Sequence, residues 1–237
     1  MADFLLIHGS CHGAWCWRDT LPFLNIPGHS ATAIDLPGHG DDRTPLAEVT
    51  LDLYAKAILA AAARIGRPVT LVGHSMAGYP ITAAAERAPQ AFARLIYLCA
   101  YLPRAGHSLI DMRRAGPSQP LLPAIQIAPD GHSFTFRPDM ARDLFYHDCP
   151  TDTLAYALPR LCPQAVVPQA TPLTPDRALR VEAHYIRCTE DRAIPPDYQA
   201  TMSAHLPAGR VTTLPTSHSP FFAAPEALAQ RLIDIAR

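Results

Sequence analysis

Short apolar runs alternate along this chain with segments of helical periodicity. Six runs rich in Val, Ile, Leu and Ala are typical of strands, and they occupy residues 4–8, 31–35, 69–73, 95–100, 181–188 and 210–214. Most are continuously apolar rather than alternating, as expected for strands buried on both faces of a sheet. The pattern predicts an α/β protein with a mostly parallel six-stranded sheet flanked by helices.

Two helical patterns are clear between and after these runs. Apolar residues recur at helical spacing from Tyr54 to Ile65, and Gly66 then ends the pattern. The second pattern follows Pro225, a residue suited to a first helical turn, and Glu226 stands where the helix dipole favours an acid. We expect helices at both places.

The alternation of strand-like and helix-like patterns is lost in the middle of the chain. Twelve of the 25 prolines lie between residues 103 and 175, together with several aromatic residues, and no strand pattern is evident there. A segment of this length with large apolar side chains is more often a functional lid than a linker. We therefore predict an α/β core from residues 1–102 and 181–237, with residues 103–180 inserted as a lid.

Composition and charge exclude several classes of function. The chain has 20 basic and 21 acidic residues, and its arginines are scattered, so no basic stripe predicts nucleic-acid binding. Apolar runs such as residues 57–63 are far shorter than the ~18 residues of a membrane span. Without a secretory signal pattern we expect a cytoplasmic protein, monomeric or homodimeric, whose six cysteines are free thiols.

A serine in a strand-turn-helix context is the first candidate for chemistry. The strand-like run 69–73 leads into HSMAG, so Ser75 occupies a G-x-S-x-G type of turn with Ala77 in place of the second glycine. Such an elbow holds a serine hydroxyl exposed on a strained turn, and small flanking residues allow the close backbone approach. Ser75 is the predicted nucleophile.

A serine needs a base, and in α/β-hydrolases the chain order is serine, acid, histidine. Three histidines follow the predicted lid: His184, His205 and His218. His184 lies in a strand run and His205 in a helical pattern, whereas His218 follows the last strand in a loop. His218 is the predicted base.

The acid should follow the strand before the base. The run 181–188 leads directly into Glu190 and Asp191, and either carboxylate could accept the Nδ1 proton of the histidine. Spacing alone does not decide whether Glu190 or Asp191 is the acid.

Backbone amides are the expected donors to the oxyanion of an acyl-transfer intermediate. The N–H of Met76, after the nucleophile, and that of Ser10, in the loop after the first strand, are the candidates. Gly9 permits the backbone path that aims the Ser10 N–H inward. The histidines and cysteines near the N-terminus match no zinc spacing, so neither a metal nor another cofactor is expected.

Four segments together resemble a known family. They are FLLIHGSCHGAW at 4–15, GHSMAG at 73–78, CTEDRAIP at 188–195 and the loop around His218. They are similar to the α/β-hydrolase branch of plant methyl esterases and hydroxynitrile lyases, which has bacterial esterase relatives. The similarity covers residues 3–100 and 181–237. It implies Ser75 as nucleophile, Asp191 as acid, His218 as base, and the Ser10 and Met76 amides as the oxyanion hole.

Differences from the lyases favour hydrolysis. The lyases of this family place a threonine where this chain has Gly9, and a lysine where it has Ser219. That ammonium would stabilise released cyanide, whereas acyl transfer needs backbone donors. The predicted function is therefore a serine carboxylesterase for a small, apolar or aryl ester. The alternatives are a hydroxynitrile-type C–C lyase and a small-molecule binding protein that keeps the triad with negligible turnover.

The substrate pocket is expected to be apolar. Phe221 and Phe222 flank the base, Tyr146 belongs to the lid, and Gly9 borders the oxyanion loop, so these four residues are the predicted lining. The competing interpretation places both phenylalanines in the ordinary hydrophobic core.

Overall fold

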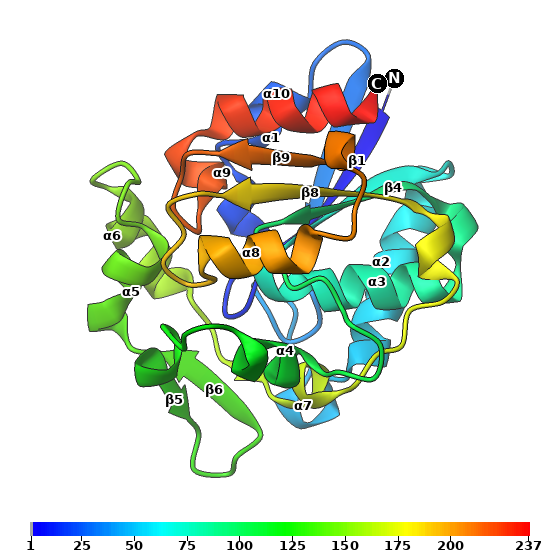
Figure 1. Ribbon diagram of the computed structural model, residues 1–237. Coiled ribbons are helices and arrows are strands. Elements are labelled where there is room, and N and C mark those ends of the chain that lie inside the picture. The colour runs from blue at the N-terminus through cyan, green and yellow to red at the C-terminus, as the bar shows by residue number, and fades with distance from the viewer. Residues whose placement is uncertain (1) are drawn as a thin grey trace.

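A central sheet of six parallel strands organises the protein. The computed structural model describes residues 2–237. The sheet has the order β2-β1-β3-β4-β8-β9 and is visible edge-on through its upper half in Figure 1. Its strands are β1 (Ala2–Ile7), β2 (His29–Ile34), β3 (Val69–His74), β4 (Phe92–Leu98), β8 (Glu182–Cys188) and β9 (Val211–Leu214). Each overlaps one of the six predicted runs, and the predicted fold class is confirmed.

Helices cover both faces of the sheet, and alternate strand residues face alternate layers. In β1, Leu5 and Ile7 pack into one core cluster, and Phe4 and Leu6 into the other. The first cluster includes residues of α2 (Leu51–Ile65), α3 (Gly78–Arg87) and α8 (Pro196–Ser203). The second includes residues of α1 (Leu21–Leu24), α9 (Pro220–Ala223) and α10 (Pro225–Ala236).

The boundaries of α2 show how the local sequence sets its length. Thr50 caps the first turn by accepting a hydrogen bond from the Leu53 N–H at 3.1 Å. Gly66 ends the helix in the left-handed region at φ 78°, a conformation that favours glycine. The helix therefore stops at the residue predicted from the sequence.

The segment between β4 and β8 forms a separate small sheet with short helices. Strands β5 (Ile125–Ile127), β6 (Ser133–Phe136) and β7 (Gln164–Ala165) pair antiparallel in that order. The helices are α4 (Leu109–Ala115), α5 (Pro138–Phe145), α6 (Thr153–Ala157) and α7 (Val167–Ala170). No strand pattern was evident here from the sequence, because strands of two to four residues are too short to show a period.

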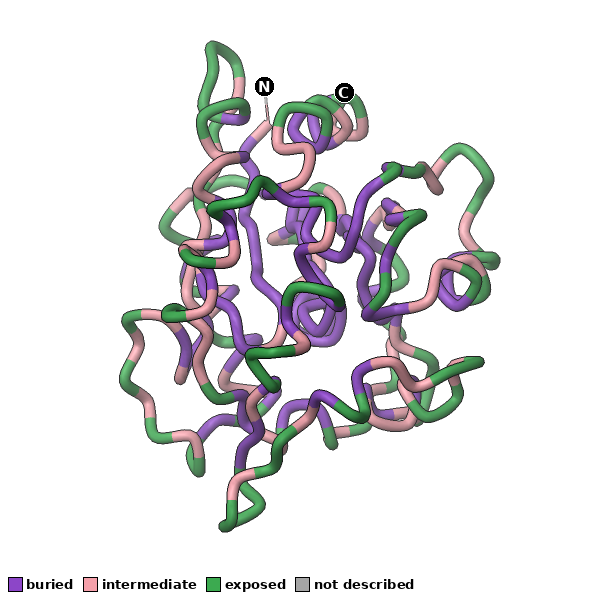
Figure 2. The backbone as a smooth tube through the Cα atoms, turned by 90° about the vertical axis from the view of Figure 1, so that its left-hand side faces the viewer, coloured by how far each residue is buried: buried purple, intermediate pink, exposed green. Residues whose placement is uncertain are grey.

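Burial divides the molecule into an interior sheet and an exposed periphery. Figure 2 shows the buried backbone running through the centre and exposed turns around it. The turn between β5 and β6, at residues 129–132, is exposed and forms the lowest point of Figures 1 and 2. All six cysteines are free thiols. Within residues 2–237, each helix is too short or too polar to cross a bilayer.

Candidate active site

Ser75 stands on a strained turn between β3 and α3. Its φ of 56° lies in the left-handed region, which is unfavourable for a residue with a Cβ atom and typical of functional sites. A Cβ added at Gly73 would lie 2.9 Å from the Ala77 carbonyl oxygen, and one at Gly78 would lie 2.0 Å from that of Tyr101. These close approaches explain the small residues of the motif. The methyl group of Ala77 is itself buried in the core.

Two loops bring a histidine and an acid to this serine. His218 follows β9, and its Nε2 lies 2.9 Å from Ser75 Oγ. Asp191 follows β8, and its Oδ2 lies 2.7 Å from His218 Nδ1. Because a carboxylate only accepts, Nδ1 carries the proton and Nε2 is left to accept from the serine hydroxyl. All three side chains are buried.

The carboxylate of Asp191 is fixed by further donors. Its Oδ1 accepts from the N–H groups of Ala193 and Ile194 at 2.7 and 2.9 Å. Its Oδ2 also accepts from Gln199 Nε2, on α8, at 2.8 Å. Glu190 is exposed, and no hydrogen bond within the described chain joins its side chain to His218. Of the two acids that spacing left open, Asp191 is therefore the one beside the base.

The loop after β1 lies directly against the elbow. A Cβ at Gly9 would stand 2.7 Å from His74 Nδ1 and 3.0 Å from Ser75 Cβ, so only glycine fits without a shift. Neither the Ser10 N–H nor the Met76 N–H donates a hydrogen bond within residues 2–237. Both donors are therefore open to an acceptor beside Ser75.

A buried histidine holds the Ser10 turn. His12 Nδ1 lies 2.8 Å from the Ser10 carbonyl oxygen, which can only accept, so Nδ1 carries the proton. Nε2 consequently accepts from the Tyr146 hydroxyl at 2.6 Å. Burial lowers the pKa of His12 to about 4, which keeps the ring neutral near pH 7. From α7, Gln169 Nε2 donates to Ser10 Oγ at 2.8 Å.

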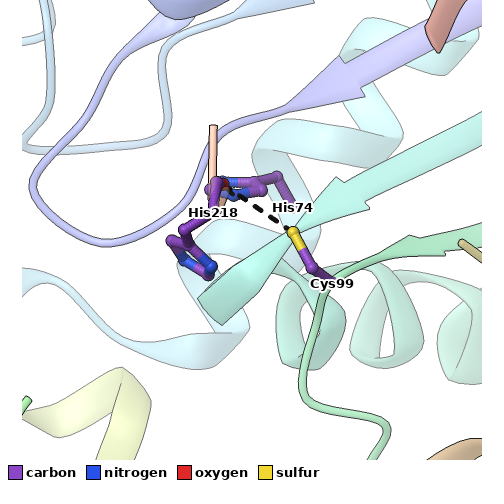
Figure 3. Close-up of side chains that lie close together, drawn as sticks. All are labelled: His74, Cys99 and His218. Atoms are coloured by element: carbon purple, nitrogen blue, oxygen red, sulfur yellow. Dashed lines mark hydrogen bonds between the residues drawn. The ribbon is translucent and has the colours of Figure 1, made fainter. Parts of the chain in front are cut away.

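His74 and Cys99 support the His218 backbone from behind (Figure 3). His74 Nε2 donates to the His218 carbonyl oxygen at 2.8 Å, and the Cys99 thiol lies 3.8 Å from the same oxygen. Burial and the neighbouring His218 and His12 hold the pKa of His74 well below its ordinary value. These three side chains have the proximity of a metal site. However, both ring nitrogens of His218 already face Asp191 and Ser75.

The segment 145–149 ties the inserted region to both loops of the triad. Asp148 Oδ2 accepts from the Ser217 N–H at 2.7 Å, next to His218. His147 Nε2 donates to the Glu190 carbonyl oxygen at 2.9 Å, next to Asp191. Ser217 Oγ also donates to the Phe145 carbonyl oxygen at 3.3 Å. The loops of the acid and the base are thus braced by the same stretch of chain.

A cavity of about 170 Å³ opens onto Ser75 and His218. The α/β core contributes mainly polar groups: Ser10, His12, His74, Ser75, Tyr101 and His218. The inserted region contributes mainly apolar ones: Leu109, Ile110, Leu121, Ile125, Ile127, Phe134, Phe136, Phe145 and Val166. Arg113, Arg114 and Gln169 complete the lining.

Four residues expected to line the pocket lie elsewhere. Phe221 and Phe222 belong to α9, which turns into the core, and the Phe221 ring packs 5.2 Å from that of Trp17. Tyr146 is fully buried against His12, and Gly9 lies behind Ser10. None of the four is among the residues that line the cavity. The aromatic walls come instead from β6 and the end of α5.

Comparison with known proteins gives one consistent result. The sequence matches the alpha/beta hydrolase family over residues 4–231. It is 30% identical to Methylesterase 1 of Arabidopsis thaliana, over 98% of this chain and 95% of that protein. It is 31% identical to methyl jasmonate esterase 1 of Vitis vinifera, over 98% and 95%. The crystal structure of a pyrethroid hydrolase from Sphingobium faniae JZ-2 has a TM-score of 0.89 and 30% identity, covering 99% of this chain and 97% of that one.

Proposed function

The chain belongs to the alpha/beta hydrolase family, and on this basis we propose that it is a serine carboxylesterase. The single observation that carries the proposal is the continuous hydrogen-bonded path from Ser75 through His218 to Asp191, with distances of 2.9 and 2.7 Å. Relatives named as methylesterases and a pyrethroid hydrolase support the same class of reaction.

The mechanism follows from the proton positions. His218 Nε2 takes the Ser75 proton as Oγ attacks the ester carbonyl carbon, and the N–H groups of Ser10 and Met76 stabilise the resulting oxyanion. Collapse breaks the bond to the alcohol oxygen, which leaves with the proton from His218. A water molecule then gives a proton to His218 and attacks the acyl-enzyme, which releases the carboxylic acid and restores Ser75. Asp191 keeps the His218 proton on Nδ1 throughout.

The geometry disfavours lyase chemistry of the hydroxynitrile type. A threonine at position 9, as in those lyases, would begin with a Cβ 2.7 Å from His74 Nδ1. The position of their lysine holds Ser219, a buried and uncharged side chain. Within residues 2–237, no lysine therefore stands beside His218 to stabilise a departing cyanide ion.

The proposed substrate is a small ester with a short alcohol and an apolar acyl group. The apolar walls of the cavity come from the inserted region, and we assign residues 103–180 the role of a lid that selects the acyl group. The named relatives support a methyl or aryl ester. Cytoplasmic localisation and a monomeric or homodimeric state stay predictions from the sequence.

Covalent labelling and turnover together test this proposal. A fluorophosphonate probe should label the wild-type protein and Ser118→Ala, which removes an exposed serine outside the site, but not Ser75→Ala. Methyl, aryl and longer-chain esters should show multiple turnovers with wild type and a loss of roughly 10⁴-fold or more in Ser75→Ala. Labelling without multiple turnover on any ester would instead identify a binding protein. Undiminished hydrolysis by Ser75→Ala would reject the mechanism.

A further inference from the structure

The charges in the active-site cavity are all of one sign. Among the side chains that line it, Arg113 and Arg114 are cationic, and none is an aspartate or a glutamate. Both arginines belong to the last turn of α4, which lies in the inserted region. The acid nearest to the chemistry, Asp191, lies behind His218, and its carboxylate already accepts hydrogen bonds from four donors. The potential in the cavity therefore favours an anion.

Arg113 has no internal partner for its charge. Its Nη1 atom is buried and lacks a hydrogen-bond partner in the described part of the chain. The carboxylate of Asp111, on the same helix, already accepts hydrogen bonds from the Ser108 N–H and hydroxyl, at 3.0 and 2.6 Å. By contrast, surface arginines such as Arg94 and Arg137 pair with Glu182 and Asp139.

Arg113 lies near a residue that is hydrogen-bonded to Ser75. Tyr101 also lines the cavity, and its N–H donates to the Ser75 carbonyl oxygen at 3.1 Å. Burial raises the pKa of Tyr101, and the Arg113 charge acts in the opposite direction, as expected for a cation near the phenol. A buried donor without a partner is costly, and a guanidinium is suited to bind a carboxylate through two parallel hydrogen bonds.

We propose that the enzyme acts on half-esters of dicarboxylic acids, with Arg113 binding the free carboxylate while the ester group lies at Ser75. This inference rests on the proposed esterase function, and it adds a charged far end to the otherwise apolar acyl group proposed there. Because the alcohol in that function is short, the acyl chain fills the cavity and carries the carboxylate toward α4. The apolar side chains of Leu109, Ile125 and Phe134 contact the methylene or aryl part between the two ends. Arg114, exposed at the rim, attracts the anion.

Matched neutral and anionic esters test the assignment. Methanol release is measured for the monomethyl esters of succinic, adipic and suberic acids and for the corresponding methyl ester amides, which have the same shape without the charge. For the best chain length, we expect wild-type kcat/KM to favour the half-ester by roughly tenfold or more. Arg113→Met should abolish this preference, because it lowers the rate for the half-ester far more than the rate for the amide. Arg64→Met, which removes an exposed arginine of α2, should retain the preference.

Two results would overturn the inference while leaving the esterase in place. One is equal wild-type rates for each matched pair at all three lengths. The other is an equal loss of both rates in Arg113→Met, which would mean that the arginine only maintains the fold of α4.

A binding measurement separates this inference from the proposed function. Calorimetry with Ser75→Ala and free adipate, succinate or suberate needs no turnover, and the corresponding diamides serve as neutral ligands. Binding of a dicarboxylate that is lost in Ser75→Ala/Arg113→Met supports the anion site. If that binding occurs while every ester stays inert in wild type, the esterase proposal alone fails. If no dicarboxylate binds at millimolar concentration, the anion site is rejected.

Discussion

The two halves of the active-site cavity are built in opposite ways. The α/β core supplies mainly polar groups, and two of them, His218 and His12, are held by hydrogen bonds at both ring nitrogens. The inserted region supplies apolar and basic side chains from strands and helices of two to eight residues, several of them exposed. Under the proposed function, this difference places bond-making chemistry and substrate selection in separately constructed parts of the chain.

The topology explains why the polar half is so well ordered. Parallel strands place their carboxyl ends at the same edge of a sheet, where α/β proteins bind ligands. The loops after β1, β3, β8 and β9 carry Ser10, Ser75, Asp191 and His218. The selective half has no such scaffold, because its three short strands pair only with one another.

Asp191→Asn should disable the polar half alone, with the largest effect that we expect. The amide would stabilise the wrong tautomer of His218, so kcat/KM should fall roughly 10⁴-fold. The ratio of rates between a methyl and a longer ester should stay the same, because the apolar walls are untouched. Steady-state kinetics on both esters measures this. A change of ratio without the loss of rate would show that the two halves are not separable.

Acid should destabilise the folded protein through its buried, neutral histidines. Burial lowers the pKa of His8, His12, His39 and His74. In the unfolded chain these histidines take up protons as the pH falls through about 6.5, whereas folded His12 stays neutral down to about 4. The free energy of unfolding should therefore fall as the pH drops from about 6.5 to about 4, with roughly 3 kcal/mol from His12 alone.

Urea unfolding at a series of pH values measures this loss. His12→Asn can still offer a side-chain N–H to the Ser10 carbonyl, but it cannot be protonated. Its unfolding free energy should therefore depend less steeply on pH than that of wild type. An identical pH dependence in the two proteins would mean that His12 does not bind fewer protons in the folded state.

Tyr146→Phe should loosen the oxyanion loop without touching substrate. The variant removes the O–H that donates to His12 Nε2, so His12 holds the Ser10 carbonyl less firmly. We expect kcat to fall roughly tenfold, on the scale of one lost hydrogen bond to a buried group, with KM unchanged. Tyr156→Phe is the matched control, because the ring of Tyr156 rather than its hydroxyl contacts Arg18, at 3.5 Å. A rise in KM alone would place Tyr146 in substrate binding.

Ile127→Ala should give the smallest effect, confined to the selective half. Ile127 is 68% exposed and lines the cavity from β5. Its loss should raise KM about twofold to fivefold for longer acyl groups and leave kcat and the rates on acetate esters unchanged. Stability should stay within about 0.5 kcal/mol of wild type, because the side chain is exposed. A large fall in kcat would contradict the separation of the two halves.

The sequence predicted the core well because its signals are local. The run 69–73 is mostly apolar and leads directly into Ser75, so both the strand and the proposed nucleophile follow from neighbouring residues. His218 followed from chain order and its loop position. Asp191 needed the family resemblance, since Glu190 beside it has the same chemistry.

The other features of the site depend on packing between residues far apart in the sequence, so they could not be predicted from it. Gln199 and Gln169 reach Asp191 and Ser10 from helices whose placement depends on the folded sheet. Phe221 and Phe222 are close to His218 in sequence, but the direction of α9 turns them into the core. In the inserted region, strands of two to four residues have no readable period.

The bracing of the triad loops by residues 145–149 limits where this protein can change. Replacing that stretch would release the supports of Ser217 and Glu190 and so disturb the neighbouring acid and base. The exposed turn at residues 129–132 has no such supporting role. New substrate preferences, whether natural or engineered, are therefore most easily acquired through the hairpin of β5 and β6. Loops could be grafted there without disturbing the residues that carry out the reaction.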